Sequence, residues 1–421
     1  MSTTNKTTTY ALTALAALWV SWVIVQYLGY HPELSNLVRH HPYQSTILGL
    51  MSLMAISGAW TLWRLRAKKY LKVPLRGFVL ITGGVLAAVI AFLAFRMQPT
   101  LAFTDHGSAV IFFLGYTALY VFMLLLLSLS SIALGRLLLR PLHYDKGHHL
   151  LALAVGLAAW GFLGTLLGLM GLLQLFVLWP LALVLLFVER KGVLRVLTDW
   201  LVVRHDWKIR HWWEIPVGLL GLMAVGVYWV GGLKPYAVGF DGAAVYANLA
   251  HLTAGYGSLP GATQAYAWSV IMAMGEVMFQ DVKLSLLLSH FMFLPALALA
   301  YQIARKWLES GHALLVVVAL ISMPFLGFHA MVDEKVDLGL LLLSLAIWLL
   351  FLLWQQDAKA KKALVWQNIL QQPYWYGILL LGFLVGFCFS VKYTSLFLCF
   401  GMLSVLAYRY AGIRLFWSLI G

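Results

Sequence analysis

Long apolar runs follow one another along most of this chain, and their length limits what it can fold into. A helix needs about 20 residues to cross about 30 Å of hydrocarbon, and twelve runs come close to that length. We expect spans at residues 10–28, 45–63, 77–95, 109–134, 150–171, 173–188, 215–232, 284–304, 312–331, 337–354, 375–391 and 394–408. Because backbone N–H and C=O groups in hydrocarbon must bond within the chain, the sequence predicts an all-α polytopic membrane protein with about 12 or 13 transmembrane helices.

The amino-acid composition excludes a water-soluble fold. Hydrophobic residues make up 62% of the 421 residues and charged residues 10%, whereas soluble domains average about 45–50% apolar and about 25% charged residues. The two cysteines, Cys388 and Cys399, both stand in apolar runs. The sequence therefore indicates neither a disulfide framework nor a cysteine metal site.

The basic residues lie between the apolar runs. A formal net charge of +14 is high, but a nucleic-acid-binding protein gathers its cations on one soluble face, so we expect no nucleic-acid partner. Alternating the spans from an inner N-terminus places 23 of the 29 Lys and Arg residues inside. This bias follows the positive-inside rule and predicts a multi-pass protein of the cell inner (plasma) membrane with a cytoplasmic N-terminus. The six outer cations are Arg39, Arg96, Lys234, Lys283, Lys335 and Lys392.

Loop lengths divide the chain into two regions. Residues 1–213 form an expected N-terminal accessory module of six transmembrane helices, which ends in the basic, Trp-bearing stretch 189–213, typical of an interfacial helix. Residues 214–421 contain one long outer segment, 233–283. Because 415–421 begins another apolar run, we expect this second region to be C-terminally incomplete.

The long outer segment begins with a candidate catalytic acid. Asp241 follows Phe240 and precedes Gly242 just after a span, where a carboxylate can accept a proton from an incoming hydroxyl. The alternative is a helix N-cap, a position that Asp favours. A second helical run, 266–279, carries Tyr266 and Trp268, and these rings favour a helix that lies at the outer membrane surface.

Three acids share a very short outer turn. Asp333, Glu334 and Asp337 are close enough in sequence to raise one another's proton affinity and to hold a cation or a substrate hydroxyl. The alternative is that Asp337 caps the helix that follows it. The sequence leaves the cofactor open, with a divalent cation as one candidate.

Lys392 stands between two apolar runs, within Val391-Lys392-Tyr393-Thr394. A cation at that depth suits an anionic lipid headgroup, above all a phosphate. The alternative is a lysine that snorkels to the outer interface.

The order of these features resembles that of a known family. The relevant motifs are Phe240-Asp241, Ala304-Arg305-Lys306, Val336-Asp337-Leu338 and Lys392-Tyr393-Thr394. Their order and sidedness resemble the GT-C membrane glycosyltransferases, in particular the bacterial branch related to protein O-mannosyltransferases and the lipid A aminoarabinose transferase (family 39-like). The resemblance covers about 214–421. It departs from the family at Gly242, where many relatives have Glu, and in the six preceding spans.

The resemblance implies a GT-C-like core with short helices in its outer loop and an inverting transfer at the outer face of the membrane. A sugar would pass from a polyprenyl-phosphate donor to a lipid, glycan or protein acceptor, with Asp241 as general base and Lys392 on the donor phosphate. Acceptor or sugar contacts are then expected among Asp333, Glu334, Asp337, Tyr246, Tyr256 and Tyr393. The oligomeric state stays open.

Two other classes have similar span numbers. A multi-pass transporter or lipid flippase usually places ionisable groups at mid-membrane and has related halves. A scaffold without catalysis would use the acids as helix caps. Here the acids gather at one outer face and the two halves differ, which favours an enzyme.

Overall fold

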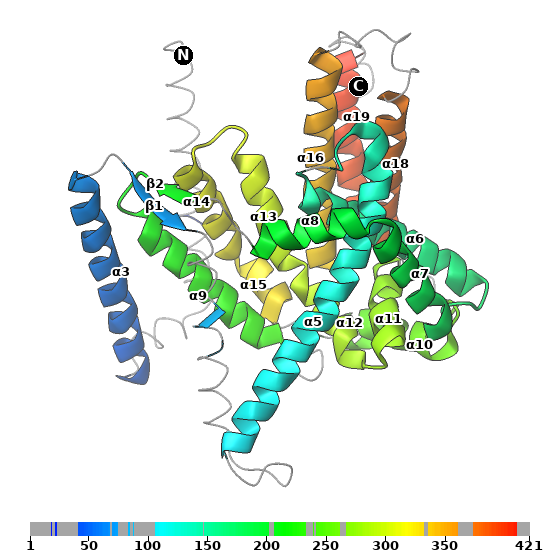
Figure 1. Ribbon diagram of the computed structural model, residues 1–421, viewed down its shortest axis with the longest axis horizontal. Coiled ribbons are helices and arrows are strands. Elements are labelled where there is room, and N and C mark those ends of the chain that lie inside the picture. Colours follow the sequence, from blue (N-terminus) through cyan, green and yellow to red (C-terminus); the bar gives the residue numbers. More distant parts are fainter. Residues whose placement is uncertain are drawn as a thin grey trace. The chain divides into compact units, whose positions relative to one another are not determined.

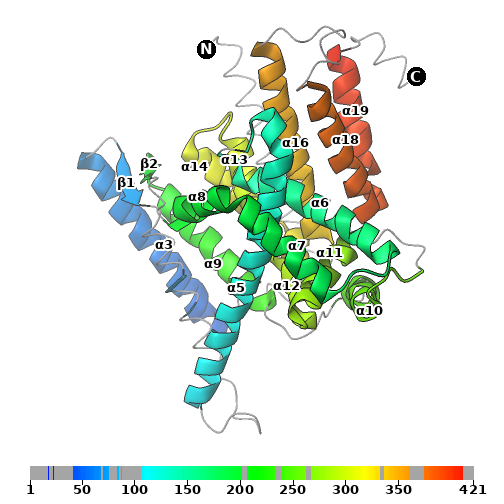
Figure 2. The same cartoon turned by 45° about the vertical axis from the view of Figure 1, so that its right-hand side comes forward.

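The computed structural model is built almost entirely from helices (Figures 1 and 2). It describes residues 41–67, 70–74, 106–145, 147–201, 206–232, 241–261, 267–331, 336–360 and 374–410, with the isolated positions 18, 22, 83, 84, 87 and 239. The chain divides into two compact units, Met1–Lys69 with His211–Pro216, and Tyr70–Arg210 with Val217–Gly421. Each unit is described by itself.

The first unit contains α3 (His41–Ala67), which covers the expected span 45–63. Its Gly58 packs closely against the segment around Trp212, because a Cβ at this position would lie 3.3 Å from the Trp212 ring. Near the end of α3, the Arg64 guanidinium lies 5.2 Å from the ring centroid of Trp63. A basic residue in the last turn is favourable at the negative end of a helix dipole.

The second unit holds the other elements of the described chain. Its N-terminal half contributes α5 (His106–Leu139), η1 (Arg140–Leu142), α6 (His149–Leu169), α7 (Leu175–Val188) and α8 (Arg190–Leu201). Its C-terminal half begins with α9 (Glu214–Gly232), whose first three residues belong to the first unit. The later elements are η2 (Asp241–Ala247), α10 (Asn248–Tyr256), α11 (Ala267–Phe279), α12 (Val282–Phe291), α13 (Phe293–Ala304), α14 (Ser310–Ile321), α15 (Pro324–Met331), α16 (Asp337–Ala360), α18 (Tyr374–Val391), η3 (Tyr393–Ser395) and α19 (Leu396–Tyr410).

Four helical segments of the described chain are long and apolar enough to cross a membrane. They are Val110–Leu142, His149–Leu169, Val282–Ala304 and Asp337–Gln356. They correspond to four of the expected spans, and this confirms the membrane-type, helical character of the chain. The expected spans at 173–188, 215–232, 312–331, 375–391 and 394–408 contain shorter apolar helices. Apart from isolated positions, those at 10–28 and 77–95 lie outside the described residues.

Proline interrupts two of the expected spans. Pro324 separates α14 from α15, and Pro295 stands in the first turn of α13, just after the break from α12. Proline has no N–H to donate and its ring crowds the preceding turn. A helix therefore tolerates proline best in its first turn, which is where both of these residues lie.

Small residues bring α5 and α6 into backbone contact. A Cβ at Gly135 would overlap the carbonyl oxygen of Ala152, and one at Gly156 would overlap that of Ser131. Ser131 and Gly135 are one turn apart on α5, as are Ala152 and Gly156 on α6. This is the small-xxx-small pattern that allows membrane helices to approach closely.

The helix α11 is a core helix, so the prediction of a surface helix at 266–279 is wrong. Residues 267–278 are all buried, and the Trp268 side chain is fully enclosed. Its indole N–H donates to Ser289 Oγ at 2.7 Å, and its ring packs against the backbone of Gly339, where a Cβ would clash with it. Trp268 is therefore an internal packing residue instead of a membrane-interface anchor, and Tyr266 lies outside the described residues.

Several contacts join loops that the sequence placed on the same side. The strands β1 (Leu71–Pro74) and β2 (Asp206–Ile209) pair antiparallel with Leu71 opposite Ile209, and both belong to expected inner loops. At the expected outer end, the Leu173 N–H donates to the Gly257 carbonyl at 3.1 Å. The relative sidedness of these loops agrees with the threading, whereas the absolute orientation in a membrane stays a prediction. The short β ribbon is a departure from the expected all-α fold.

We expect Gly135→Ala to destabilise the protein, because its methyl group must push α5 and α6 apart at a backbone contact. The expected loss is about 1–3 kcal/mol, measurable as a lower melting temperature in detergent by circular dichroism. Gly115→Ala is the matched control on the same helix, since nothing lies within 4 Å of a Cβ there. Equal melting temperatures for the two variants would contradict this account of the α5–α6 contact.

Candidate functional site

Lys392 and Asp337 form an ion pair between the start of α16 and the junction of α18 with η3. Lys392 Nζ lies 2.8 Å from Asp337 Oδ1, and the two side chains are 25% and 13% exposed. Asp337 is the first residue of α16, and Lys392 stands between α18 and η3. Two residues that are 55 positions apart in the chain thus meet in the structure.

The backbone around Lys392 holds it in place. Its N–H donates to the Cys388 carbonyl at 3.0 Å, and its own carbonyl accepts from the Ser395 N–H at 3.0 Å. The second carboxylate oxygen of Asp337, Oδ2, is buried and accepts no hydrogen bond from the described residues. The site therefore offers one ammonium group with donors to spare and one carboxylate oxygen with acceptor capacity.

The ion pair bears on the two alternatives that the sequence left open, a snorkelling Lys392 and a helix-capping Asp337. Snorkelling alone would direct the Lys392 ammonium away from the bundle, but it points to a carboxylate on a neighbouring helix. Asp337 also stands in the first turn of α16, where the helix dipole favours an anion. The helix-start role and the pairing role of Asp337 are thus compatible.

Asp241 lies on the surface at the start of a helical segment. It is exposed and is the first residue of η2, a π-helical turn that continues directly into α10. Such turns are rare and frequently occur at functional sites. The Ala243 N–H donates to the Gly239 carbonyl at 2.9 Å, so the helical hydrogen bonding begins just before Asp241.

The predicted tyrosines differ in their surroundings. Tyr256 and Tyr393 are 71% and 68% exposed, and Tyr393 directly follows Lys392. Tyr246 instead packs against the hydrophobic core. Tyr393 is therefore the tyrosine best placed to meet a molecule bound at the ion pair. Asp333 and Glu334 lie outside the described residues, so the three-acid cluster stays a prediction.

Sequence reasoning did not single out a second buried carboxylate with a histidine partner. Glu276 on α11 places Oε1 at 2.6 Å from Nδ1 of His251 on α10, and the two side chains are 10% and 60% exposed. Its Oε2 lies 3.3 Å from Ser285 Oγ. The sequence signal that could have indicated this pair is a glutamate inside the apolar run Met272–Met278. Ionisable groups in such runs usually have partners.

Two residues of the expected outer segment have structural roles at the turn before α12. Asp281 is the N-cap of α12 and accepts from the Lys283 N–H at 2.8 Å, and its other oxygen accepts from Tyr120 OH at 2.9 Å. The Lys283 side chain is buried and donates from Nζ to the Gly232 carbonyl at 3.0 Å, at the C-terminal end of α9. A cation is favourable at that end of a helix.

Another group of charges lies near the end of α5. Arg136 Nε donates to Glu189 Oε2 at 3.2 Å, and Arg140 pairs with the other oxygen of the same carboxylate. Arg136 and Glu189 are both buried. Gly192 leaves room for the arginine, because a Cβ there would lie 2.5 Å from Arg136 Nε. This network fixes the junction between α7 and α8 to α5.

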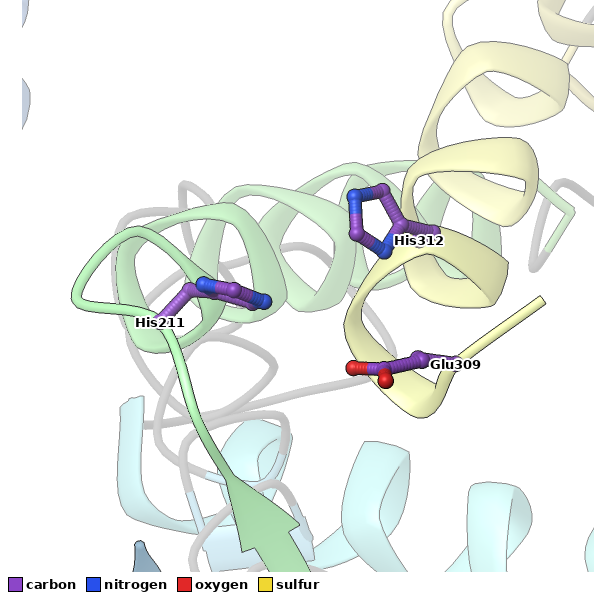
Figure 3. Close-up of side chains that lie close together, drawn as sticks. All are labelled: His211, Glu309 and His312. Atoms are coloured by element: carbon purple, nitrogen blue, oxygen red, sulfur yellow. The ribbon is translucent and has the colours of Figure 1, made fainter. Parts of the chain in front are cut away.

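Figure 3 shows His211, Glu309 and His312, whose side chains carry metal-ligating atoms. His211 belongs to the first unit and the other two residues to the second, so no metal site is assigned to this set. Within the second unit, Glu309 Oε1 lies 3.0 Å from Arg210 Nη1.

Comparisons of this chain with protein-family models, with curated proteins and with solved structures found no match.

We expect Lys392→Met to lower stability, because it leaves the Asp337 carboxylate largely buried without its cation. The expected loss is about 1–3 kcal/mol, measured as a fall in melting temperature. The double variant Lys392→Met with Asp337→Asn removes both charges and should regain most of that loss. A double variant no more stable than the single one would show that the ion pair is not what matters at this position.

Proposed function

We propose that this chain is a membrane glycosyltransferase of the GT-C type. It moves a sugar from a polyprenyl-phosphate donor to a hydroxyl of a lipid, glycan or protein acceptor at the outer face of the cell inner (plasma) membrane. Support comes from the order of the motifs between Phe240 and Thr394. The observation that carries the proposal is the partly buried Lys392–Asp337 ion pair.

The ion pair suits a lipid-linked phosphate. The lysine ammonium has three donors, and one of them is directed to Asp337 Oδ1, so the others are available to phosphate oxygens. Asp337 holds the ammonium group in position, and the lysine side chain is a quarter exposed. A cation so placed stabilises the negative charge that develops on the departing phosphate.

Asp241 is the proposed general base. The acceptor oxygen attacks the anomeric carbon, its proton passes to the Asp241 carboxylate, and the bond between that carbon and the phosphate oxygen breaks. The bonding electrons leave with the polyprenyl phosphate, and a single displacement inverts the anomeric centre. Exposure of Asp241 leaves it accessible to an acceptor, and the exposed Tyr393 beside Lys392 offers a face on which a sugar can stack.

A transporter or lipid flippase is the second candidate, because of two ionisable groups inside the bundle. The Glu276 and Lys283 side chains are buried on α11 and α12, and such groups often mark ion or substrate pathways. An enzymatic assay in detergent separates the two classes. A transferase can convert its substrates in a micelle, whereas a transporter has no second compartment into which it could move them. Turnover of a labelled polyprenyl-phosphate sugar by the purified protein in detergent supports the transferase, and its absence with a range of acceptors favours the transporter.

Asp241→Asn should abolish transfer and leave folding intact, because the side chain is exposed. We expect a fall in turnover of at least about 100-fold, with an unchanged melting temperature. Asp199→Asn is the matched control, since Asp199 on α8 is also exposed and lies on the expected inner side. Full activity of Asp241→Asn would remove Asp241 from the mechanism.

Donor affinity should depend on the cation at position 392. Because Lys392→Met with Asp337→Asn removes both charges, it should bind a labelled polyprenyl-phosphate sugar at least about tenfold more weakly, a loss of one charged hydrogen bond. The single variant Asp337→Asn keeps the ammonium but removes the carboxylate that positions it, so its donor affinity should fall between those of the unmodified protein and the double variant. If the double variant binds donor as tightly as the unmodified protein, the phosphate contact lies elsewhere.

A further inference from the structure

The α7–α8 junction combines an apolar surface with a row of cations. On α7, the last exposed side chains are Val184, Phe187 and Val188, with exposed fractions of 58%, 67% and 59%. Directly after Glu189, the exposed side chains of α8 include Arg190, Lys191 and Arg195. Figure 2 shows α8 continuing from the end of α7. The exposed apolar side chains of α7 are therefore followed closely by the exposed basic side chains of α8.

The three cations of α8 share one face of the helix. Positions 190, 191, 194, 195, 198 and 199 are exposed, whereas Val193 and Val196 are buried. The one acid among the exposed positions, Asp199, lies 3.2 Å from His149 Nε2. Residues spaced by three and four positions lie on the same side of an α-helix. The basic face is therefore turned away from the protein core. Leu194 lies on this exposed face and is 59% exposed.

The position of the cations on α8 is unfavourable without an anion. Arg190 and Lys191 stand in the first turn of the helix, which contains no acidic residue. The positive end of the helix dipole disfavours cations there. Among the described residues, no carboxylate pairs with Lys191 or Arg195. Arg190 instead lies over the ring of Phe187, with its Cζ 4.6 Å from the ring centroid.

The junction is fixed in place from the buried side. Glu189 is held by Arg136 and Arg140, so its charge is engaged within the bundle and is turned away from the basic face. Arg140 is itself 59% exposed beside Glu189 and adds a fourth cation to this end of the bundle. The basic face is therefore a preorganised positive surface that borders an apolar one.

We infer that the α7–α8 junction binds an anionic phospholipid. Arg190, Lys191 and Arg195 would contact the headgroup phosphate, and the acyl chains would lie along Val184, Phe187 and Val188. A free phosphate would use the cations alone, whereas a lipid uses both surfaces. Polybasic segments next to a span attract anionic lipid with about 1 kcal/mol per Lys or Arg. The site is independent of the proposed glycosyl transfer.

The test uses the full chain in neutral detergent, titrated with phosphatidylglycerol or with phosphatidylcholine. We expect phosphatidylglycerol to raise the melting temperature and to remain bound in native mass spectrometry, and phosphatidylcholine to do neither. The variant Lys191→Gln with Arg195→Gln should retain at least about tenfold less phosphatidylglycerol, since it loses two headgroup contacts. Both side chains are exposed, so the variant should keep its helical circular dichroism spectrum.

A matched control removes two basic residues from another turn. Arg305→Gln with Lys306→Gln, at the end of α13, should retain phosphatidylglycerol like the unmodified protein. Glycerol phosphate, the headgroup without acyl chains, should not displace the lipid at equal concentration. Equal retention of both lipids, unchanged retention in Lys191→Gln with Arg195→Gln, or displacement by glycerol phosphate would each overturn the inference.

Discussion

A charged side chain inside an apolar bundle needs a partner, and this constraint decides which helices of the second unit lie together. Lys392, between α18 and η3, meets Asp337 on α16, and the exposed His251 on α10 meets the buried Glu276 on α11. Burial of an isolated charge is costly, and removal of one partner leaves the other uncompensated. Each pair thus favours one particular contact between two segments. The hydrophobic effect alone is non-directional and would not select these neighbours over other apolar ones.

Close packing makes these pairs rigid enough to serve as a site. The indole of Trp268 packs on the backbone of Gly339, two residues after Asp337, and its N–H is held by Ser289. The start of α16 is therefore fixed against α11 and α12, and Figure 1 shows these helices near one another. A cation held by such a frame has one defined position, which the proposed contact with a donor phosphate requires.

The same physics separates two kinds of surface on this protein. Lys392 is paired with a carboxylate and partly buried, which suits the selective contact proposed for one donor phosphate. On α8 the cations are exposed, which suits the longer-range attraction of an anionic membrane surface. A cation that is partly buried and paired has a defined position. An exposed cation attracts anions over a longer distance, and salt screens this attraction.

Sequence and structure agree on the long helices and disagree on a short one. The runs that contain Val110–Leu142 and Asp337–Gln356 are strongly apolar. An apolar run of that length fits few structures other than a membrane-spanning helix. The run 266–279 is apolar too, but an apolar stretch with a tryptophan fits a membrane-surface helix and a core helix equally well. Only the neighbours of Trp268, Ser289 and Gly339, show that α11 is internal. The four-residue strands β1 and β2 were not expected, because their pairing partners are far apart in the chain.

By itself the sequence determined that the chain is helical and apolar enough for a membrane. It also predicted which loops lie on the same side, and the loop contacts in the structure agree with that prediction. These are local properties, since hydropathy and charge are read along consecutive residues. Only the tertiary structure decided that Lys392 faces Asp337 and that Glu276 faces His251. A partner across 55 or 25 positions is a matter of spatial packing, which depends on how side-chain shapes fit between helices and leaves no periodic signal in the chain.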